Sequence, residues 1–267
     1  AIGYAFDFEW INKNLFNNVY IRTNSFFANS NLASYGLPSI EERELLEPIK
    51  QYIPKTVFKQ KYRPQSSETN NEIRIGLRKA NILLEKSGWV IEKGKRVKLI
   101  NGKKIFLKFE ILLVNPDNER IAIIFSRNLK KLGIEVSIRT VDSAQYQKRR
   151  QNYDFDMIIN KWRVTLSPGN EQAFYWGSNA ANTSGTRNYI GIKNEGVDIL
   201  INKITKTTER KELVTAIKAL DRVLLHNFFV IPMYHIEIDR VAYWNKISRP
   251  NKTPIYGYVL ETWWSNN

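Results

Sequence analysis

The sequence predicts an α/β fold in which helices cross over one face of a parallel sheet. Strand-like and helix-like segments alternate across residues 109–162, which is the order that βαβ units require. Asn101-Gly102 lies between two alternating apolar segments, a strong hairpin pattern. The chain has 267 residues, 43% of them hydrophobic and 12% aromatic, which is enough for a sizeable core and excludes wholesale disorder.

The overall charge and the absence of cysteine limit the classes of function that this protein can have. Lys and Arg number 41 and Asp and Glu 26, so the formal net charge is +15, which makes nucleic acid a partner class to test. No apolar run approaches the ~20 residues of a membrane-spanning helix. The sequence has no Cys, which excludes disulfides, thiolate metal sites and thiol catalysis.

The first third of the chain is mainly helical. Tyr4, Phe8 and Ile11 recur at helical spacing and predict a helix over residues 1–16, followed by a loop over 19–38. Ser39 and Glu42 have the spacing of a capping box, which opens a short helix that stops at Pro48. An irregular stretch over 51–71 precedes an amphipathic helix over 72–87.

The middle of the chain contains the predicted sheet. The hairpin pairs residues 97–100 with 103–107, and its second strand is expected to continue through 109–114. Right-handed crossover makes the strands at 109–114 and 134–141 parallel. The remaining predicted elements here are a helix over 119–132, a helix over 143–150 and a third strand over 155–162.

The last third opens with a long loop over residues 167–195, rich in Gly, Asn and Ser. A loop of this length in a compact domain is more often functional than idle. Two helices are expected after it, over 197–204 and 209–227, then strands over 229–238, 241–244 and 256–264.

The positive charge is concentrated around the hairpin. Ten basic and two acidic residues lie between Arg78 and Lys108, a local net charge of +8. Lysines of the hairpin alternate with Val97, Leu99 and Ile105, as in a half-buried ribbon with one wet face. We therefore expect a solvated face here, rather than the aromatic-rich surface typical of nucleic-acid binding.

No motif predicts an enzyme. His226 and His235 have no metal-ligand partner at helical or hairpin spacing, and Asp154 and Asp156 flank the entry to a strand, where carboxylates are usually solvated. Phosphate-binding glycine loops, Gly-x-Ser-x-Gly and His-Glu-x-x-His are not found in the sequence. We expect a protein without catalysis, cofactor or bound metal.

Trp162 is the main candidate for ligand contact. It follows the third predicted strand, and ligands of open α/β sheets gather beyond the carboxyl ends of strands. A core tryptophan that caps the sheet explains its position equally well, so both readings stay open at this point.

Several segments together resemble a known family. Ala1-Ile-Gly-Tyr-Ala-Phe-Asp7, Leu129-Lys-Lys-Leu-Gly-Ile134 and Ile231-Pro-Met-Tyr234 are similar to the C-terminal half of ABC-importer substrate-binding proteins of the oligopeptide/dipeptide class, solute-binding protein family 5. Arg139-Thr-Val-Asp-Ser-Ala-Gln-Tyr146 and Ser167-Pro-Gly-Asn-Glu171 resemble the Yej-type receptors within it, which the family associates with uptake of oligopeptides and microcin C.

The resemblance implies an architecture and a role. It implies a type II periplasmic-binding-protein-like fold, in which residues 1–228 form the second, C-terminal ligand-binding lobe and 229–267 the crossover and terminal strands that return to the first lobe. The N-terminal lobe would be absent from this chain, which begins at Ala1 without a leader and is expected to be a fragment. The implied function is periplasmic capture of oligopeptides or peptide-nucleotide conjugates for an inner-membrane ABC permease.

Individual residues follow from the same resemblance. Trp162 falls on the family's ligand-contacting tryptophan, but residues 163–168 lack the acid that follows it in peptide receptors and pairs with the peptide amine. Arg163, Asn170, Arg187 and Asn188 are further candidates for ligand contact from the long loop, because arginine can bind a carboxylate or phosphate in bidentate fashion.

Two alternatives and two physical expectations accompany this interpretation. The alternatives are a basic nucleic-acid-binding module and a degenerate remnant without ligand. We expect that the protein has no nucleic-acid partner. Without the missing lobe we expect weak peptide binding or none, and self-association through the aromatic segment at 256–264.

Overall fold

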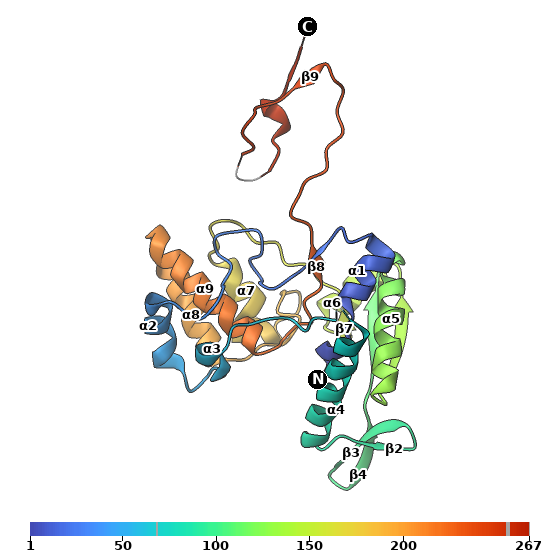
Figure 1. Cartoon of the computed structure of the whole chain (residues 1–267). Coiled ribbons are helices and arrows are strands. Elements are labelled where there is room, and N and C mark those ends of the chain that lie inside the picture. Colours follow the sequence, from blue (N-terminus) through green and yellow to red (C-terminus); the bar gives the residue numbers. More distant parts are fainter. Residues whose placement is uncertain (68, 255–256, 267) are drawn as a thin grey trace.

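A computed structural model describes residues 1–67, 69–254 and 257–266 of the chain. A helical part around α9 and a sheet-bearing part around α5 lie next to each other, and the ribbon β2-β3-β4 projects from the lower end of the second (Figure 1). The C-terminal segment leaves the body at β8 and extends away from it (Figure 1). The mixed α/β fold expected from the sequence is confirmed.

The elements of the described residues are as follows. The helices are η1 (Ile2–Ala5), α1 (Phe8–Phe16), α2 (Ile40–Leu46), η2 (Glu47–Ile49), α3 (Thr56–Lys59), α4 (Asn70–Lys86), α5 (Asp117–Lys131), α6 (Ser143–Gln151), α7 (Glu171–Trp176), η3 (Ser178–Asn182), α8 (Glu195–Lys206), α9 (Arg210–His226) and η4 (Leu260–Thr262). The strands are β1 (Ile21–Arg22), β2 (Val90–Glu92), β3 (Lys95–Ile100), β4 (Lys103–Phe106), β5 (Lys108–Leu113), β6 (Glu135–Thr140), β7 (Met157–Ile158), β8 (Tyr234–His235), β9 (Ile247–Ser248) and β10 (Trp264–Ser265).

The central sheet has the order β6-β5-β7, with both pairs parallel, so the expected parallel crossover through α5 is confirmed. The third strand is shorter than expected, because only Met157 and Ile158 pair with β5. Just beyond them, the carbonyl of Ile159 accepts a hydrogen bond from the hydroxyl of Tyr146 at 3.2 Å instead of a ladder bond. The chain therefore leaves the sheet several residues before Trp162.

Two separate cores stabilise the body. Apolar side chains of α5, such as Ile121, Phe125 and Leu129, pack on the sheet together with residues of η1, α1 and α4. A second core joins α2, α3, α7, α8 and α9, and the α9 residues Ile217, Leu220 and Val223 are fully buried in it. The polypeptide passes between the two cores several times, including through β1 and β8, which pair with each other.

The N-terminal helix is interrupted, contrary to the single helix expected over residues 1–16. Residues 2–5 form a 3-10 turn, Phe6 is extended, and α1 begins only at Phe8. Asp7 is the N-cap, and its carboxylate accepts a hydrogen bond from the Trp10 amide at 3.2 Å. A side chain that satisfies an orphan amide at this position fixes the helix start.

The β2-β3-β4 ribbon forms as the Asn101-Gly102 pattern predicts, with Ile100 opposite Lys103. It is anchored by Arg96, a fully buried side chain whose guanidinium donates to the carbonyls of Leu132 and Trp89 and to the amide oxygen of Asn81. The second hairpin strand and the next strand are separate elements: the Leu107 amide still donates to the Arg96 carbonyl, which extends the hairpin by one residue, and β5 then begins at Lys108 in another sheet.

The apolar face of the ribbon differs from the expectation of a half-buried hairpin. Val97 is buried, but Leu99 is 68% exposed and Ile105 41% exposed, since the outer half of the ribbon projects beyond the helices. Part of the positive charge is compensated by ion pairs of Lys104 with Glu92 and of Lys95 with Glu135.

The region expected to be one long loop over 167–195 is partly helical, because it contains α7 and η3. Gln172, Tyr175 and Trp176 of α7 are buried, and the Trp176 indole donates to the Gln172 side chain at 3.0 Å. Burial of aromatic residues therefore orders a segment that its Gly, Asn and Ser content had marked as irregular.

The C-terminal strands are also shorter than expected. Only Tyr234 and His235 of the expected strand over 229–238 pair, and their partner is β1, within a stretch predicted to be a loop. Residues 241–244 form no strand, and the terminal pairing joins β10 to β9. Of the strand expected over 256–264, position 256 lies outside the described residues and Trp264 pairs with Ser248.

Candidate functional site

Trp162 lies at the junction of the two parts of the molecule, in the irregular segment that follows β7. Its ring is half-buried and packs against Trp176, with ring centroids 4.8 Å apart, and against Phe26 at 6.1 Å. Tyr189 lies on another side of it, at 6.4 Å. The indole N–H donates to the Arg187 carbonyl at 3.2 Å, which couples the tryptophan to the loop that precedes α8.

The support behind this aromatic group comes from α9. The Asp221 carboxylate is fully buried and accepts four hydrogen bonds, from the Ser25 hydroxyl, the Phe26 amide, and the amide and hydroxyl of Ser34. Burial raises the pKa of the Asp221 carboxyl, and these hydrogen bonds oppose that shift. One side chain thus fixes the backbone position of Phe26, and with it the ring that packs on Trp162.

A cavity of about 590 Å³, which we call the α6–α7 pocket, lies between the end of α6, the start of α7 and the loop before α8. It brings together two of the predicted site residues, Asn170 and Arg187. The other residues around it are Gln147, Arg150, Gln151, Glu171, Phe174, Tyr175, Gly185, Thr186 and Tyr189. Through Tyr189 and Arg187 the pocket adjoins the aromatic group around Trp162.

Arg150 is the most distinctive side chain of the α6–α7 pocket. Its guanidinium carbon lies 5.7 Å from the ring centroid of Tyr146 and 5.5 Å from that of Tyr189, so it is held between two aromatic rings. Nη2 donates to the Gln147 side chain at 2.6 Å, whereas Nε is buried without a hydrogen-bond partner. Burial raises the pKa of the Tyr146 hydroxyl, and the charge of Arg150 opposes that shift.

The acid of the α6–α7 pocket is already engaged by the protein. Both carboxylate oxygens of Glu171 lie 3.0 Å from the Gly169 amide, and one also accepts from the Gln172 side chain. Two arginines and one bonded carboxylate leave the lining with a formal charge of +1. The pocket lining therefore has more positively charged donor groups than negatively charged acceptor groups.

The other two predicted residues occupy different positions. Arg163 is exposed and is not part of the pocket lining, and its carbonyl accepts a hydrogen bond from the Tyr175 hydroxyl at 3.2 Å. Asn188 is 1% exposed, and its amide group donates to the carbonyls of Gly177 and Ile192 and accepts from the Ile192 amide. The Asn188 side chain thus holds the loop together from inside.

Arg150 was not among the residues predicted for the site. In the sequence it belongs to Lys148-Arg149-Arg150, which reads as a favourable basic helix end. The spacing of four residues from Tyr146 is the one local feature that places an aromatic ring beside it. Its second ring, from Tyr189, comes from a distant segment that local spacing does not identify.

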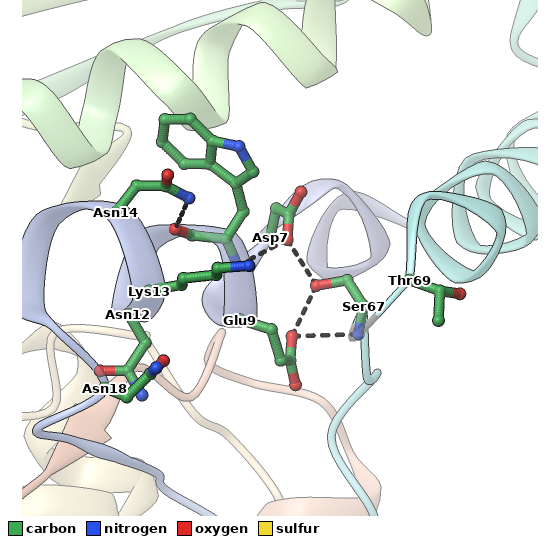
Figure 2. A pocket seen from close by; sticks show the side chains of 9 residues that line it. Asp7, Glu9, Asn12, Lys13, Asn14, Asn18, Ser67 and Thr69 are labelled. Atoms are coloured by element: carbon green, nitrogen blue, oxygen red, sulfur yellow. Dashed lines mark hydrogen bonds between the residues drawn. The ribbon is translucent and has the colours of Figure 1, made fainter.

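A second cavity of about 550 Å³ lies beside the start of α1 (Figure 2). There the Ser67 hydroxyl lies 2.6 Å from an oxygen of Asp7 and 2.5 Å from an oxygen of Glu9, whose carboxylate also accepts the Ser67 amide at 3.0 Å (Figure 2). Because Asp7 also caps α1, these carboxylates join the segment at Ser67 to the helix. Their contacts are structural.

Arg22, on β1, is the cation associated with this acidic group. Its guanidinium stacks 4.8 Å from the Phe6 ring centroid, and Nε and Nη1 are buried with no hydrogen-bond partner within residues 1–67, 69–254 and 257–266. Burial lowers the pKa of Arg22 to about 10, and the charges of Glu9 and Asp7 oppose that shift. Among the described residues the guanidinium has no direct ion pair, and the charges of Glu9 and Asp7 act on it at longer range.

Both histidines form hydrogen bonds within the protein, and the histidine and acidic side chains of the described ranges do not cluster as metal ligands. Within residues 1–67, 69–254 and 257–266, no group of three or more His, Cys, Asp or Glu side chains is placed to hold a metal ion. His226 shares a hydrogen bond with the Thr56 hydroxyl and His235 one with the Thr23 hydroxyl. No helix in the part of the chain that the structure describes has the length and apolar character needed to cross a bilayer.

Comparison with known proteins places the chain among solute-binding proteins. Over residues 1–184 it matches the family described as bacterial extracellular solute-binding proteins, family 5 Middle. It is 41% identical to the probable peptide-binding protein YejA of Agrobacterium fabrum and 36% identical to the peptidoglycan-binding protein YepA of the same organism. Each alignment covers 99% of this chain and 43% of the relative, so the chain spans about two-fifths of the length of these proteins.

The fold comparison agrees with the sequence comparison. The structure of the oligopeptide-binding protein AppA from Bacillus subtilis, in complex with a nonapeptide, superposes with a TM-score of 0.65 over 99% of this chain and 46% of AppA, at 20% identity. The resemblance inferred from the sequence motifs, including the similarity to Yej-type proteins, is therefore confirmed. The chain belongs to family 5 of the bacterial extracellular solute-binding proteins.

Proposed function

We propose that this chain is the ligand-binding C-terminal part of a peptide receptor that delivers its cargo to an ABC importer without catalysis. The observation that carries the proposal is the aromatic group around Trp162, which lies beyond the carboxyl end of β7 beside a cavity of about 590 Å³. Ligands of open α/β sheets gather at this end of the strands. Relatives named as peptide-binding, at about 40% identity, support the same class of ligand.

The organisation into lobes is part of the proposal. Residues 1–228 would form the second lobe, and 229–267 the crossover and the strands that return to a first lobe carried elsewhere. The segment after β8 extends away from the body (Figure 1), and Trp244 and Leu260 in it are 78% and 60% exposed. Exposed apolar side chains of this size are typical of a surface that another domain covers.

The predicted site residues take different roles in this proposal. Trp162 would provide an apolar wall for the ligand, and Asn170 and Arg187 would provide polar contacts from the adjoining pocket. Asn188 would act indirectly, by holding the loop on which Arg187 lies. Arg163 would reach the ligand only from outside the pocket, since its side chain is exposed.

The ligand class extends to modified peptides. Relatives named for peptides and for peptidoglycan support a ligand with a peptide portion. Residues 163–168 contain no acid, so recognition of a free peptide amine would need another group. Conjugates such as microcin C, a permease partner in the inner membrane and a periplasmic location complete the proposal as expectations.

The test is a titration of the chain with tri- to nonapeptides, followed by the NMR resonance of the Trp162 indole N–H. We expect saturable shifts with weak affinity at this indole and at the backbone amides of its neighbours Arg187 and Tyr189. Trp162→Ala removes the indole resonance itself, so its effect is measured at those two amides, where the shifts should be abolished. Trp10→Ala, at a half-exposed tryptophan beside the other cavity, should leave them unchanged. No response to any peptide would contradict peptide binding, and a sub-micromolar dissociation constant by calorimetry would contradict the need for a second lobe.

A further inference from the structure

Arg150 is a half-buried cation with unused hydrogen-bonding capacity at the edge of a cavity. The side chain lies between two tyrosine rings and makes one hydrogen bond, to Gln147, among the described residues. Its Nε is buried and has no hydrogen-bond partner in the part of the chain that the structure describes. A guanidinium has five N–H donors in a fixed planar arrangement, so most of them have no protein acceptor within the described part of the chain.

The other groups around the α6–α7 pocket favour an anion. Arg187 is exposed, and its side chain makes no hydrogen bond or ion pair among the described residues. Gln147 and Gln151 add neutral amide donors from α6, and the carboxylate of Glu171 is already bonded to the Gly169 amide. An incoming anion would therefore meet two guanidinium groups, together with one acid whose charge is partly neutralised by its own donors.

The pocket is also connected to the proposed peptide-binding wall. The Arg187 carbonyl accepts a hydrogen bond from the Trp162 indole N–H at 3.2 Å. The Tyr189 ring contacts both Arg150 and Trp162. A ligand that covers Trp162 can therefore place one of its groups beside both arginines.

We propose that the α6–α7 pocket binds an anionic group of the ligand, a carboxylate or a phosphate, between Arg150 and Arg187. This inference rests on the proposed peptide-binding function and specifies the ligand class: peptides with an acidic side chain or a phosphate-bearing substituent. A carboxylate and a phosphate each have at least two acceptor oxygens, which match the paired N–H donors of arginine.

The test uses the whole chain labelled with ¹⁵N, with three probes: inorganic phosphate, acetyl-Gly-Glu-Gly-amide and its Gln counterpart. We expect phosphate and the Glu peptide to shift the Arg150 Nε–Hε resonance and the backbone amides of Gly185 and Thr186. We expect the Gln peptide to bind at least about tenfold more weakly than the Glu peptide, because a charge-assisted pair is lost. A stronger response to phosphate than to the Glu peptide would identify a phosphate-bearing ligand, and the reverse an acidic peptide.

Variants separate this site from non-specific attraction to a basic protein. Arg150→Gln and Arg187→Gln should each weaken binding of the anionic probes by about tenfold or more, and Arg150→Lys should restore only part of it. Arg127→Gln, at an exposed arginine of α5, is the matched control and should change nothing.

The outcomes distinguish this inference from the broader proposal. Equal binding of the Glu and Gln peptides, unaffected by Arg150→Gln, would overturn the anion site and leave peptide binding in place. Phosphate shifts at Gly185 that need Arg150, without any peptide response at Trp162, would support the anion site and contradict the peptide receptor. Absence of shifts at the pocket with every anionic probe would overturn the inference.

Discussion

Replacement of Arg222 by Ala should cause the largest loss of stability among single substitutions in the helical core. Arg222 is 4% exposed and donates from Nε and Nη2 to the two carboxylate oxygens of Glu42, at 3.1 and 3.2 Å. It also donates to the carbonyls of Tyr35, Gly36 and Leu37, at 2.8, 2.8 and 3.1 Å. Removing the guanidinium leaves a buried carboxylate and three carbonyls without this partner.

The magnitude follows from the buried charge. Breaking a buried ion pair by removing one partner costs about 3–5 kcal/mol, a large part of the roughly 5–15 kcal/mol that stabilises a domain. Urea unfolding followed by far-UV circular dichroism measures the change. The double variant Arg222→Met/Glu42→Leu removes both charges and should recover part of the loss, but not all, because Glu42 also completes the capping box of α2.

A matched control uses another basic residue of α9. Lys211→Ala, at an exposed position, should change the free energy of unfolding by less than about 0.5 kcal/mol. If Arg222→Ala were equally mild, the buried pair would not hold the 35–37 loop against α9 and α2, and the reasoning would be refuted.

The remaining predictions concern pH, a tight turn and association. Burial lowers the pKa of His226 in the folded chain, so the free energy of unfolding should fall as pH drops below about 6.5. Urea titrations at several pH values measure this dependence of the free energy of unfolding on pH. His226→Gln should reduce the dependence, whereas His235→Gln should retain it. Gly133→Ala should destabilise the chain by about 1–3 kcal/mol in thermal unfolding, because φ is +76° and a Cβ would lie 3.0 Å from the Arg96 amide nitrogen; an unchanged midpoint would contradict this strain. Deletion of residues 240–267 should convert a self-associating chain to a monomer in light scattering, and a monomeric intact chain at high concentration would count against an exposed association surface.

Elements defined by local chemistry were predictable from the sequence. The Asn101-Gly102 turn, the capping box at Ser39 and the amphipathic periods of α4, α5 and α9 depend on neighbours within one or two turns, and the structure has each of them. The parallel pairing of β5 with β6 followed from the handedness of the crossover.

Features that depend on distant contacts were missed. The helix start at Asp7 is supported by a hydrogen bond from Ser67. β1 exists only through its pairing with β8, which lies more than 200 residues away along the chain. The strand expected over 155–162 was too long, because a side-chain hydroxyl, that of Tyr146, replaces the ladder after Ile158.

The candidate site shows the same division. The position of Trp162 after a strand could be read from the sequence, and so could the presence of Arg187 in a long connection. The side-chain amide of Asn188 faces inward, where it donates hydrogen bonds to the backbone carbonyls of Gly177 and Ile192, and no local pattern in the sequence indicates this orientation. Arg150 joined the pocket through Tyr189, and no local pattern connects those two residues.

The hydrogen bonds that Asp221 accepts have a consequence for the entropy of binding. They tie Ser25, Phe26 and Ser34 to a helix of the core, so the rings of Phe26 and Trp162 are already packed before a ligand arrives. Ordering a mobile side chain on binding costs about 0.5–1.5 kcal/mol. In the proposed receptor, a wall held in place by α9 would avoid that loss, and the contact energy of the ligand would then contribute to affinity instead of to ordering the protein.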